Sequence, residues 1–182
     1  MKTQNFYYET ERLILRHATE EDADILASKR SCSFVTRYNL YQDCDGEQIK
    51  RELGKYEHIL LVLKSSREII GCVSVRDDYF RYRIDSKCLY AWLTEDMAYQ
   101  GFMLEALQVI MAKLFYLNGH ERIAIQIFSE NTASLRLARK LGFEEEGYLK
   151  RGLKNHLGQV YDVVLLSLDR ESFIEQHYNP FS

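Results

Sequence analysis

The turn before residues 102–118 is the part of the sequence best suited to hold an anion. Gly101 stands between a strand-like segment, residues 88–93, and a long apolar helical segment. Free backbone N–H groups and the positive end of the helix dipole meet at a helix N-terminus, and a glycine there lets a ligand approach the backbone closely. The same arrangement is also common as a plain connection. The sequence therefore indicates either a phosphate-binding turn or a simple link.

A second polar junction lies between residues 122–128, which alternate as a strand, and a short helix expected at 132–141. Asn131 and Ser134 stand at this junction. Both residue types cap helices well, and both can also donate or accept hydrogen bonds to a ligand. One side of the short helix is basic, which predicts either a solvated face or a contact with a phosphate group; its cations are Arg136, Arg139 and Lys140.

The other expected elements must position these two junctions. Apolar positions at helical spacing predict a long helix over 102–118, and the polar turn 65–67 between two apolar runs predicts an antiparallel hairpin. Gly142 is expected to end the short helix in a left-handed conformation. The expected strands are 12–17, 59–64, 68–75, 88–93, 122–128, 143–149 and 160–168, and the expected helices are 20–26, 46–56, 102–118 and 132–141.

This order of elements predicts the fold class. Hairpins interrupt any regular strand–helix alternation, so the pattern favours an α/β (α+β) fold with a mixed, mostly antiparallel sheet over a parallel doubly wound one. We expect six to seven strands and about four helices. The 182 residues contain no repeat, low-complexity tract or linker, which predicts a single domain over 1–182.

Composition excludes several classes of function. The chain is 46% hydrophobic and 28% charged, with a net charge of −3, so it has no general attraction to nucleic acid or to an anionic membrane. No signal peptide and no apolar run of membrane-spanning length is present, so we expect a cytoplasmic protein. The four cysteines, at 32, 44, 72 and 88, have neither zinc-site nor disulfide spacing; we expect small buried or half-buried side chains and no metal.

Four passages, in a fixed order, span nearly the whole chain. They are residues 11–16, residues 101–107, the pair Asn131 and Ser134 followed by 140–143, and residues 158–163. Together they resemble the first strand, the coenzyme A loop and helix, the second cofactor motif and the last strand of the GNAT superfamily of N-acetyltransferases. The resemblance is to the branch containing the RimJ/RimL-like ribosomal-protein N-terminal acetyltransferases.

The resemblance implies that acetyl-coenzyme A lies where the sheet splays between the two central strands, 88–93 and 122–128. Asn131 would bond the pantetheine arm, Ser134 would lie near the thioester sulfur, and Arg139 and Lys140 are candidates for the ribose phosphate. Main-chain groups would make the other contacts, with Trp92, Leu93 and Thr94 on the pantetheine, and Tyr99, Gln100, Gly101, Phe102 and Met103 on the pyrophosphate.

The pyrophosphate loop departs from the family pattern. The usual loop has glutamine or arginine where this chain has Ala98, and a second glycine where it has Tyr99. A bulky residue disfavours the positive φ that a glycine adopts. Either Tyr99 replaces the glycine in a loop of full length, or two residues are deleted and the loop is shorter. Both alternatives predict weaker pyrophosphate binding than is typical of the family.

The implied reaction is direct attack of a primary amine on the thioester in a ternary complex, since no cysteine has the setting of an activated nucleophile. The resemblance makes Ser134 the proton donor to the departing thiolate. His156 could act as the general base, with an ordinary pKa of about 6.5, although a lone loop histidine is commonly structural. Carboxylates at strand ends are alternatives acting through water: Asp77, Asp78 and Glu95.

Residues 28–56 are expected to line the acceptor pocket. Their aromatic and charged side chains are compatible with a cationic amine but do not identify it; these are Phe34, Arg37, Tyr38, Tyr41, Asp43 and Asp45. The N-terminal amine of a protein or peptide ranks first by resemblance alone. The alternative is an inactive or weakly active GNAT-like domain that binds coenzyme A or a protein partner. A nucleotide-binding regulatory domain is a more remote reading, and the chain could be a monomer or a homodimer.

Overall fold

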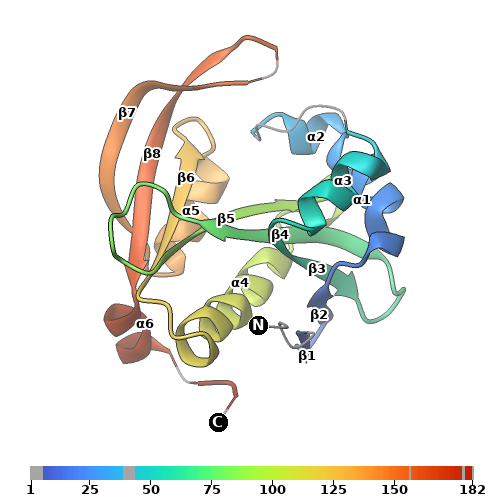
Figure 1. Ribbon diagram of the computed structural model, residues 1–182, viewed down its shortest axis with the longest axis horizontal. Coiled ribbons are helices and arrows are strands. Elements are labelled where there is room, and N and C mark those ends of the chain that lie inside the picture. Colours follow the sequence, from blue (N-terminus) through green and yellow to red (C-terminus); the bar gives the residue numbers. More distant parts are fainter. Residues whose placement is uncertain (1–5, 39–43, 156, 178, 182) are drawn as a thin grey trace. The chain divides into compact units, whose positions relative to one another are not determined.

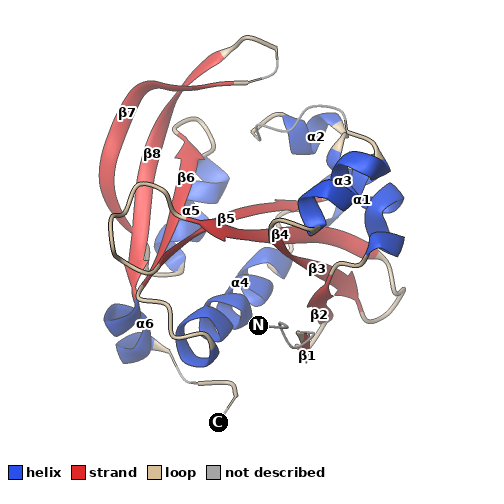
Figure 2. Cartoon of the chain, in the orientation of Figure 1, coloured by secondary structure: helices blue, strands red, loops and turns tan. Residues whose placement is uncertain are grey.

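The computed structural model describes residues 6–38, 44–155, 157–177 and 179–181. Figure 2 shows its helices and strands. The strands are β1 Tyr7–Glu9, β2 Leu13–His17, β3 Glu57–Leu63, β4 Ile69–Asp77, β5 Ser86–Leu93, β6 Arg122–Phe128, β7 Glu144–Lys154 and β8 Val160–Asp169. The helices are α1 Ala23–Arg30, α2 Ser33–Thr36, α3 Gly46–Leu53, α4 Phe102–Ala112, α5 Thr132–Lys140 and α6 Arg170–Gln176. Single turns of 3-10 helix occupy Glu20–Asp22 and Glu95–Met97, and a π-helical turn occupies Lys113–Leu117.

The eight strands found among the described residues form one mixed sheet in the order β1-β2-β3-β4-β5-β6-β8-β7. The β1–β2, β2–β3, β3–β4, β6–β8 and β7–β8 pairs are antiparallel, and β5–β6 is parallel. The expected mixed, mostly antiparallel fold is confirmed, with one strand more than predicted. The parallel ladder covers three residue pairs, Ser86–Cys88 with Arg122–Ala124.

The chain forms two compact units. The first consists of Met1–Val75 and Tyr90–Ala106, and the second of Arg76–Leu89 and Leu107–Ser182. The strands β4 and β5 and the helix α4 contribute residues to both units. Figure 1 shows the path of the chain through each unit.

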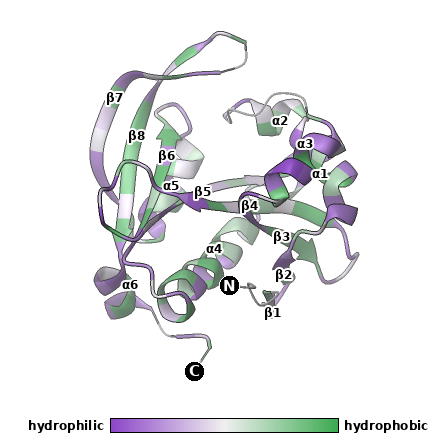
Figure 3. Ribbon diagram, in the orientation of Figure 1, coloured by the Kyte–Doolittle hydropathy of each residue, from purple (hydrophilic) through white to green (hydrophobic). Residues whose placement is uncertain are grey.

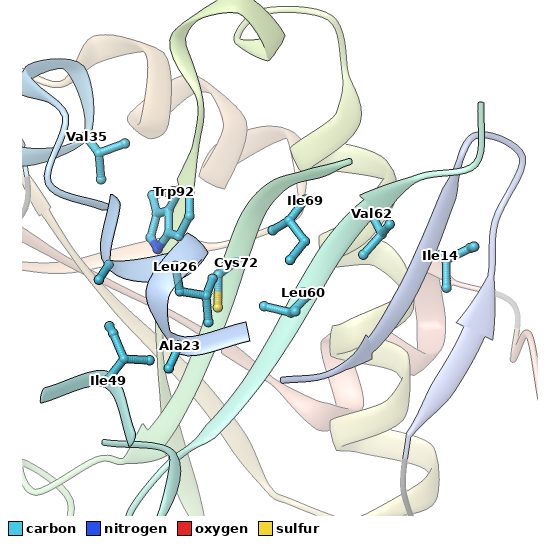
Figure 4. Packing of buried hydrophobic residues seen from close by; sticks show 11 residues of the cluster. Ile14, Ala23, Leu26, Val35, Ile49, Leu60, Val62, Ile69, Cys72 and Trp92 are labelled. Carbon is cyan, nitrogen blue, oxygen red and sulfur yellow. The ribbon is translucent and has the colours of Figure 1, made fainter. Parts of the chain in front are cut away.

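The core of the first unit lies between its strands and the helices α1, α2 and α3. Its buried side chains come from both layers, and Figure 4 shows Leu26 of α1 and Cys72 of β4 beside Trp92 of β5. Arg30 of α1 is buried and forms an ion pair with Glu52 of α3, at 2.6 Å. The described part of the region expected to line an acceptor pocket therefore includes α2 and α3, which pack on this core, while Tyr41 and Asp43 lie outside the described residues.

A β-bulge in β4 brings the end of β5 close to its neighbour. Leu61 of β3 pairs with Gly71 and Val62 pairs with Ile69, so Ile70 is an extra residue on β4. The Ile70 carbonyl accepts the backbone N–H of Thr94, at 2.8 Å. A Cβ atom on Gly71 would lie 2.4 Å from the Trp92 carbonyl oxygen, which explains the glycine. The bulge therefore fixes the backbone where β5 leads into the candidate loop.

The second unit is built on β6, β8 and β7. In Figure 3 the ribbon of β8 is largely hydrophobic and that of β7 largely hydrophilic. This agrees with their burial, because β7 is mostly exposed at the edge of the sheet. The rings of Phe115 and Phe173 pack at 4.9 Å between centroids. No helix among the described residues is long and apolar enough to cross a membrane.

Candidate functional site

The loop between β5 and α4 has two residues in the left-handed conformation. Tyr99 has φ of 62° and Gly101 has φ of 85°, with Gln100 between them and α4 starting at Phe102. Tyr99 thus adopts a conformation that a glycine favours and that a residue with a Cβ atom disfavours. Its side chain is 83% exposed, so the phenol ring projects into solvent instead of packing into the loop.

This backbone leaves a row of N–H groups available at the start of α4. The first bond of the helix runs from the Glu105 N–H to the Gly101 carbonyl, at 3.1 Å. The N–H groups from Tyr99 to Met103 make no hydrogen bond with any described residue, while the helix dipole places partial positive charge at the same end. These groups suit an anion such as a diphosphate.

Arg12 of the β1–β2 connection contacts this loop, a role that the sequence analysis missed. Its guanidinium Nη1 donates to the Gln100 carbonyl at 3.0 Å, and its Nε and Nη2 both lie 2.7 Å from Glu105 Oε2. Its Cζ lies 4.2 Å from the centre of the Phe102 ring. The only signal in the sequence was the presence of Arg12 and Glu105 in two passages of the family resemblance, to which no role was given.

Glu105 is held as a carboxylate by several donors. Burial raises its pKa, but hydrogen bonds from the Thr10 hydroxyl, the Arg12 backbone N–H and the Arg12 guanidinium outweigh burial, so the pKa lies below its usual value. The negative charge on Glu105 is therefore paired with Arg12 at neutral pH.

At the end of β5, Thr94 has a side-chain group without a hydrogen-bond partner in the described part of the chain. Trp92 is buried in the core of the first unit. The Thr94 N–H is already bonded to Ile70, but the Thr94 hydroxyl oxygen is buried and makes no hydrogen bond with a described residue. An unpartnered buried hydroxyl needs a partner, and the polar amides of a pantetheine arm would fit this need.

Asn131 and Ser134 lie in the second unit at the start of α5. Asn131 caps this helix, because its Oδ1 accepts the Ser134 N–H at 3.1 Å. Capping is therefore the observed role of the Asn131 oxygen, while its amide nitrogen has no partner among the described residues. Ser134 is half-buried, and its hydroxyl likewise makes no hydrogen bond with a described residue. Both groups are available to a ligand.

The cations of α5 differ in their availability. Arg139 forms an ion pair with Glu145 at the start of β7, and both side chains are exposed. Lys140 and Arg136 are exposed and have no ion-pair partner in the described part of the chain. An exposed pair such as Arg139–Glu145 opens at little cost, so Arg139 remains a candidate beside Lys140.

The candidate general bases have different surroundings. His156 lies outside the described residues. Asp77 forms an ion pair with Lys87 at 2.6 Å, and Asp78 accepts the Ser86 hydroxyl at 2.8 Å. Glu95 is exposed, in the turn that precedes Tyr99. The two aspartates thus have local structural partners, and Glu95 has none among the described side chains.

Asp162 makes several contacts at the start of β8, a role not assigned from the sequence. Its carboxylate accepts the Arg151 N–H at 2.7 Å and the Tyr148 hydroxyl at 2.6 Å, and these bonds lower the pKa of Asp162. The Asp162 carbonyl accepts the Ser129 N–H at 3.0 Å, just before α5. The stacked rings of Phe128 and Tyr161, 4.8 Å apart, pack beside it. Asp162 therefore supports the loop that carries Asn131.

The cysteines agree with the expectation of small packed side chains. All four are free thiols, two buried and two half-buried. No group of three or more potential metal ligands occurs in the described ranges.

Comparison with known proteins identifies the family of this chain. Residues 12–144 match the family described as Acetyltransferase (GNAT) domain. This chain belongs to the GNAT family, and it is an acetyl-coenzyme A-dependent acyltransferase by that membership.

Two relatives of this chain are named as N-acetyltransferases. It is 27% identical to the uncharacterized N-acetyltransferase YoaA of Bacillus subtilis (strain 168), over 88% of this chain and 94% of YoaA. It is 29% identical to the uncharacterized N-acetyltransferase p20 of Bacillus licheniformis, over 90% of this chain and 96% of p20.

Solved structures share the fold. The ribosomal-protein-S5-alanine acetyltransferase of Vibrio fischeri superposes with a TM-score of 0.82 at 21% identity, covering 92% of this chain and 98% of that one. RimL, a ribosomal L7/L12 α-N-protein acetyltransferase solved in complex with coenzyme A, superposes with a TM-score of 0.77 at 20% identity, covering 90% and 98%. These neighbours match the branch that the sequence resembles.

Proposed function

We propose that this chain transfers the acetyl group of acetyl-coenzyme A to a primary amine, and that the amine is the N-terminus of a protein or peptide. The observation that carries the proposal is the row of N–H groups from Tyr99 to Met103, free of partners among the described residues and set at the start of α4. Such a row suits the diphosphate of the coenzyme.

The reaction is direct attack within a ternary complex. The neutral amine nitrogen bonds to the carbonyl carbon of the thioester, the carbon–sulfur bond breaks, the nitrogen loses one proton to become an amide, and the departing thiolate gains one proton. We assign that proton donation to Ser134, whose hydroxyl has no partner among the described residues. Main-chain groups near Leu93 polarise the carbonyl oxygen, and Asn131 binds the pantetheine through its amide nitrogen.

The general base remains one of four residues in this proposal. His156 and the carboxylates of Asp77, Asp78 and Glu95 are the candidates. A base acting through water suits an amine whose pKa lies within about one unit of neutral pH. An α-amine has an ordinary pKa near 8, against about 10.4 for lysine, so its deprotonation at neutral pH costs less free energy.

The choice of acceptor is supported by likeness alone. Two solved neighbours bear names that specify ribosomal proteins, one as an S5-alanine acetyltransferase and the other as an L7/L12 α-N-protein acetyltransferase. We infer an N-terminal amine for this chain by analogy with those names.

Two measurements test the proposal. Isothermal titration with acetyl-coenzyme A should detect binding, and thiol release should follow when a peptide with a free N-terminus is added. The matched control is the same peptide with its N-terminus acetylated, which should release no thiol above background. Release with lysine side chains or polyamines and not with N-termini would overturn the acceptor class. Binding without release for any amine would favour a non-catalytic binding domain.

A further inference from the structure

Arg12 joins three segments of the first unit. Its guanidinium contacts Glu105 of α4 through Nε and Nη2, donates to the Gln100 carbonyl through Nη1, and lies over the Phe102 ring. The second oxygen of Glu105 accepts the Thr10 hydroxyl and the Arg12 N–H. The guanidinium thus links the β1–β2 connection to the loop and to the first turn of the helix.

The contact with the Gln100 carbonyl determines where the next N–H group points. A trans peptide is planar, with its carbonyl oxygen and its N–H on opposite sides. Because the Gln100 oxygen faces Arg12, the Gly101 N–H must face away from Arg12. If this peptide rotated, a carbonyl oxygen would replace an N–H group on the side where an anion binds. Rotation of the Gln100–Gly101 peptide changes ψ of Gln100 and φ of Gly101. Tyr99 and Gly101, on either side of Gln100, both have positive φ.

The negative charge of Glu105 also affects whether an anion can bind at the start of α4. A carboxylate in the first turn of a helix interacts favourably with the dipole, but it also repels an incoming diphosphate. Here the Glu105 charge is paired with Arg12, and both of its oxygens accept hydrogen bonds. Pairing therefore leaves the helix start favourable to an anion.

We propose that Arg12, held by Glu105, is a positioning residue that keeps the Gln100–Gly101 peptide oriented for the diphosphate of acetyl-coenzyme A. The proposal rests on the proposed function of the loop. If Arg12 had only a structural role, it would stabilise the fold, and its replacement would affect acetyl donors with and without a diphosphate equally.

The test compares Arg12→Lys with a matched control in the same unit. Lysine keeps the charge but loses the fork that joins Glu105 to Gln100. The control is Arg16→Lys, because Arg16 of β2 makes a similar paired contact with Asp22, at 2.8 Å through each nitrogen, and forms no hydrogen bond or ion pair with the described residues of the loop. Both variants are assayed with acetyl-coenzyme A and with S-acetylpantetheine, which lacks the diphosphate.

The expected result is a KM for acetyl-coenzyme A raised about tenfold in Arg12→Lys, with kcat nearly unchanged, as follows from the loss of a charged hydrogen bond that acts on binding. The kcat/KM with S-acetylpantetheine should stay at the parent value, and Arg16→Lys should match the parent with both donors. Equal effects of the two variants, or equal losses with the two donors, would overturn the role of Arg12 while leaving the proposed function intact. A parent protein that neither binds nor uses acetyl-coenzyme A would instead overturn the proposed function.

A second measurement tests the proposal if Arg12→Lys folds poorly or if the protein does not detectably use S-acetylpantetheine. Glu105→Gln retains the side-chain shape and weakens the ion pair, so it should shift KM in the same direction by a smaller factor. In the protein without ligand, the backbone amide resonance of Gly101 should move in Arg12→Lys and in Glu105→Gln but not in Arg16→Lys. An unmoved Gly101 resonance in both loop variants would contradict the proposal.

Discussion

Replacing Tyr99 with glycine tests the most unusual backbone feature of the loop. Tyr99 has φ of 62° and is 83% exposed, so its side chain contributes little packing while its backbone carries the left-handed strain. That strain is worth roughly 1–2 kcal/mol for a residue with a Cβ atom. Glycine removes the strain. It also makes the unfolded chain more flexible, so folding loses more conformational entropy, at a cost of about 0.4–1 kcal/mol.

The difference between these two terms favours glycine by about 0.5–1 kcal/mol. For a chain of this size, 1 kcal/mol corresponds to a change in Tm of about 2–4 °C. The matched control is Tyr99→Ala, which removes the ring but keeps the strain, and it should lie within about 0.5 kcal/mol of the parent because the side chain is exposed.

Thermal and urea unfolding measure the stability, and calorimetry measures the affinity for acetyl-coenzyme A. Tyr99→Gly should be more stable than Tyr99→Ala and should bind acetyl-coenzyme A at least as tightly as the parent. A Tyr99→Gly protein less stable than Tyr99→Ala would refute the left-handed conformation at this position. A large loss of affinity in both variants would show that the phenol ring itself contacts the coenzyme.

Four further outcomes are expected. Asn131→Ala should lose about 1 kcal/mol of stability because it loses the helix cap, whereas Asn131→Asp keeps the cap. Both variants should raise KM for acetyl-coenzyme A in steady-state kinetics. Normal kinetics in Asn131→Asp would leave Asn131 with a capping role only. Ser134→Ala should lower kcat more than cofactor affinity, measured by steady-state kinetics and calorimetry; an unchanged kcat would remove Ser134 from the reaction. Because the pKa of Glu105 is depressed in the folded state, its stabilising contribution is present above the ordinary value of 4.5 and is lost as pH falls through the folded pKa. Acid unfolding of Glu105→Gln should therefore depend less steeply on pH below 4.5 than that of the parent, and identical profiles would contradict this. Gly71→Ala places a Cβ 2.4 Å from the Trp92 carbonyl and should lower Tm strongly; a Tm equal to that of the parent would contradict the close approach of β4 and β5.

Elements with a long, regular pattern were predicted well. The helix expected over 102–118 is α4 followed by a π-helical turn, and the hairpin around 65–67 is β3–β4. Gly142 has the expected positive φ, 88°, at the end of α5. The missed elements were β1, α2 and α6, which have three, four and seven residues. Such short segments contain too few residues for a periodicity to be recognised.

The two predicted junctions were located correctly, but their contacts were not predictable from spacing. The strand β7 continues to Lys154, five residues beyond its expected end, because it pairs with β8 and not because its own sequence alternates clearly. Likewise the partners of Asp162 come from β7, through Tyr148 and Arg151. Both cases depend on a neighbouring strand that local pattern does not identify.

The sequence by itself determined the features that depend on neighbouring residues: the apolar face of α4, the glycine before it, and the capping pair Asn131 and Ser134. These follow from the chemistry of a few consecutive side chains. Only the tertiary structure decided that Arg12 contacts Glu105, 93 residues away, and that Tyr99 adopts a conformation its own side chain disfavours. The physical reason is that long-range contacts and packing can outweigh a local preference of 1–2 kcal/mol, roughly the cost of one strained residue.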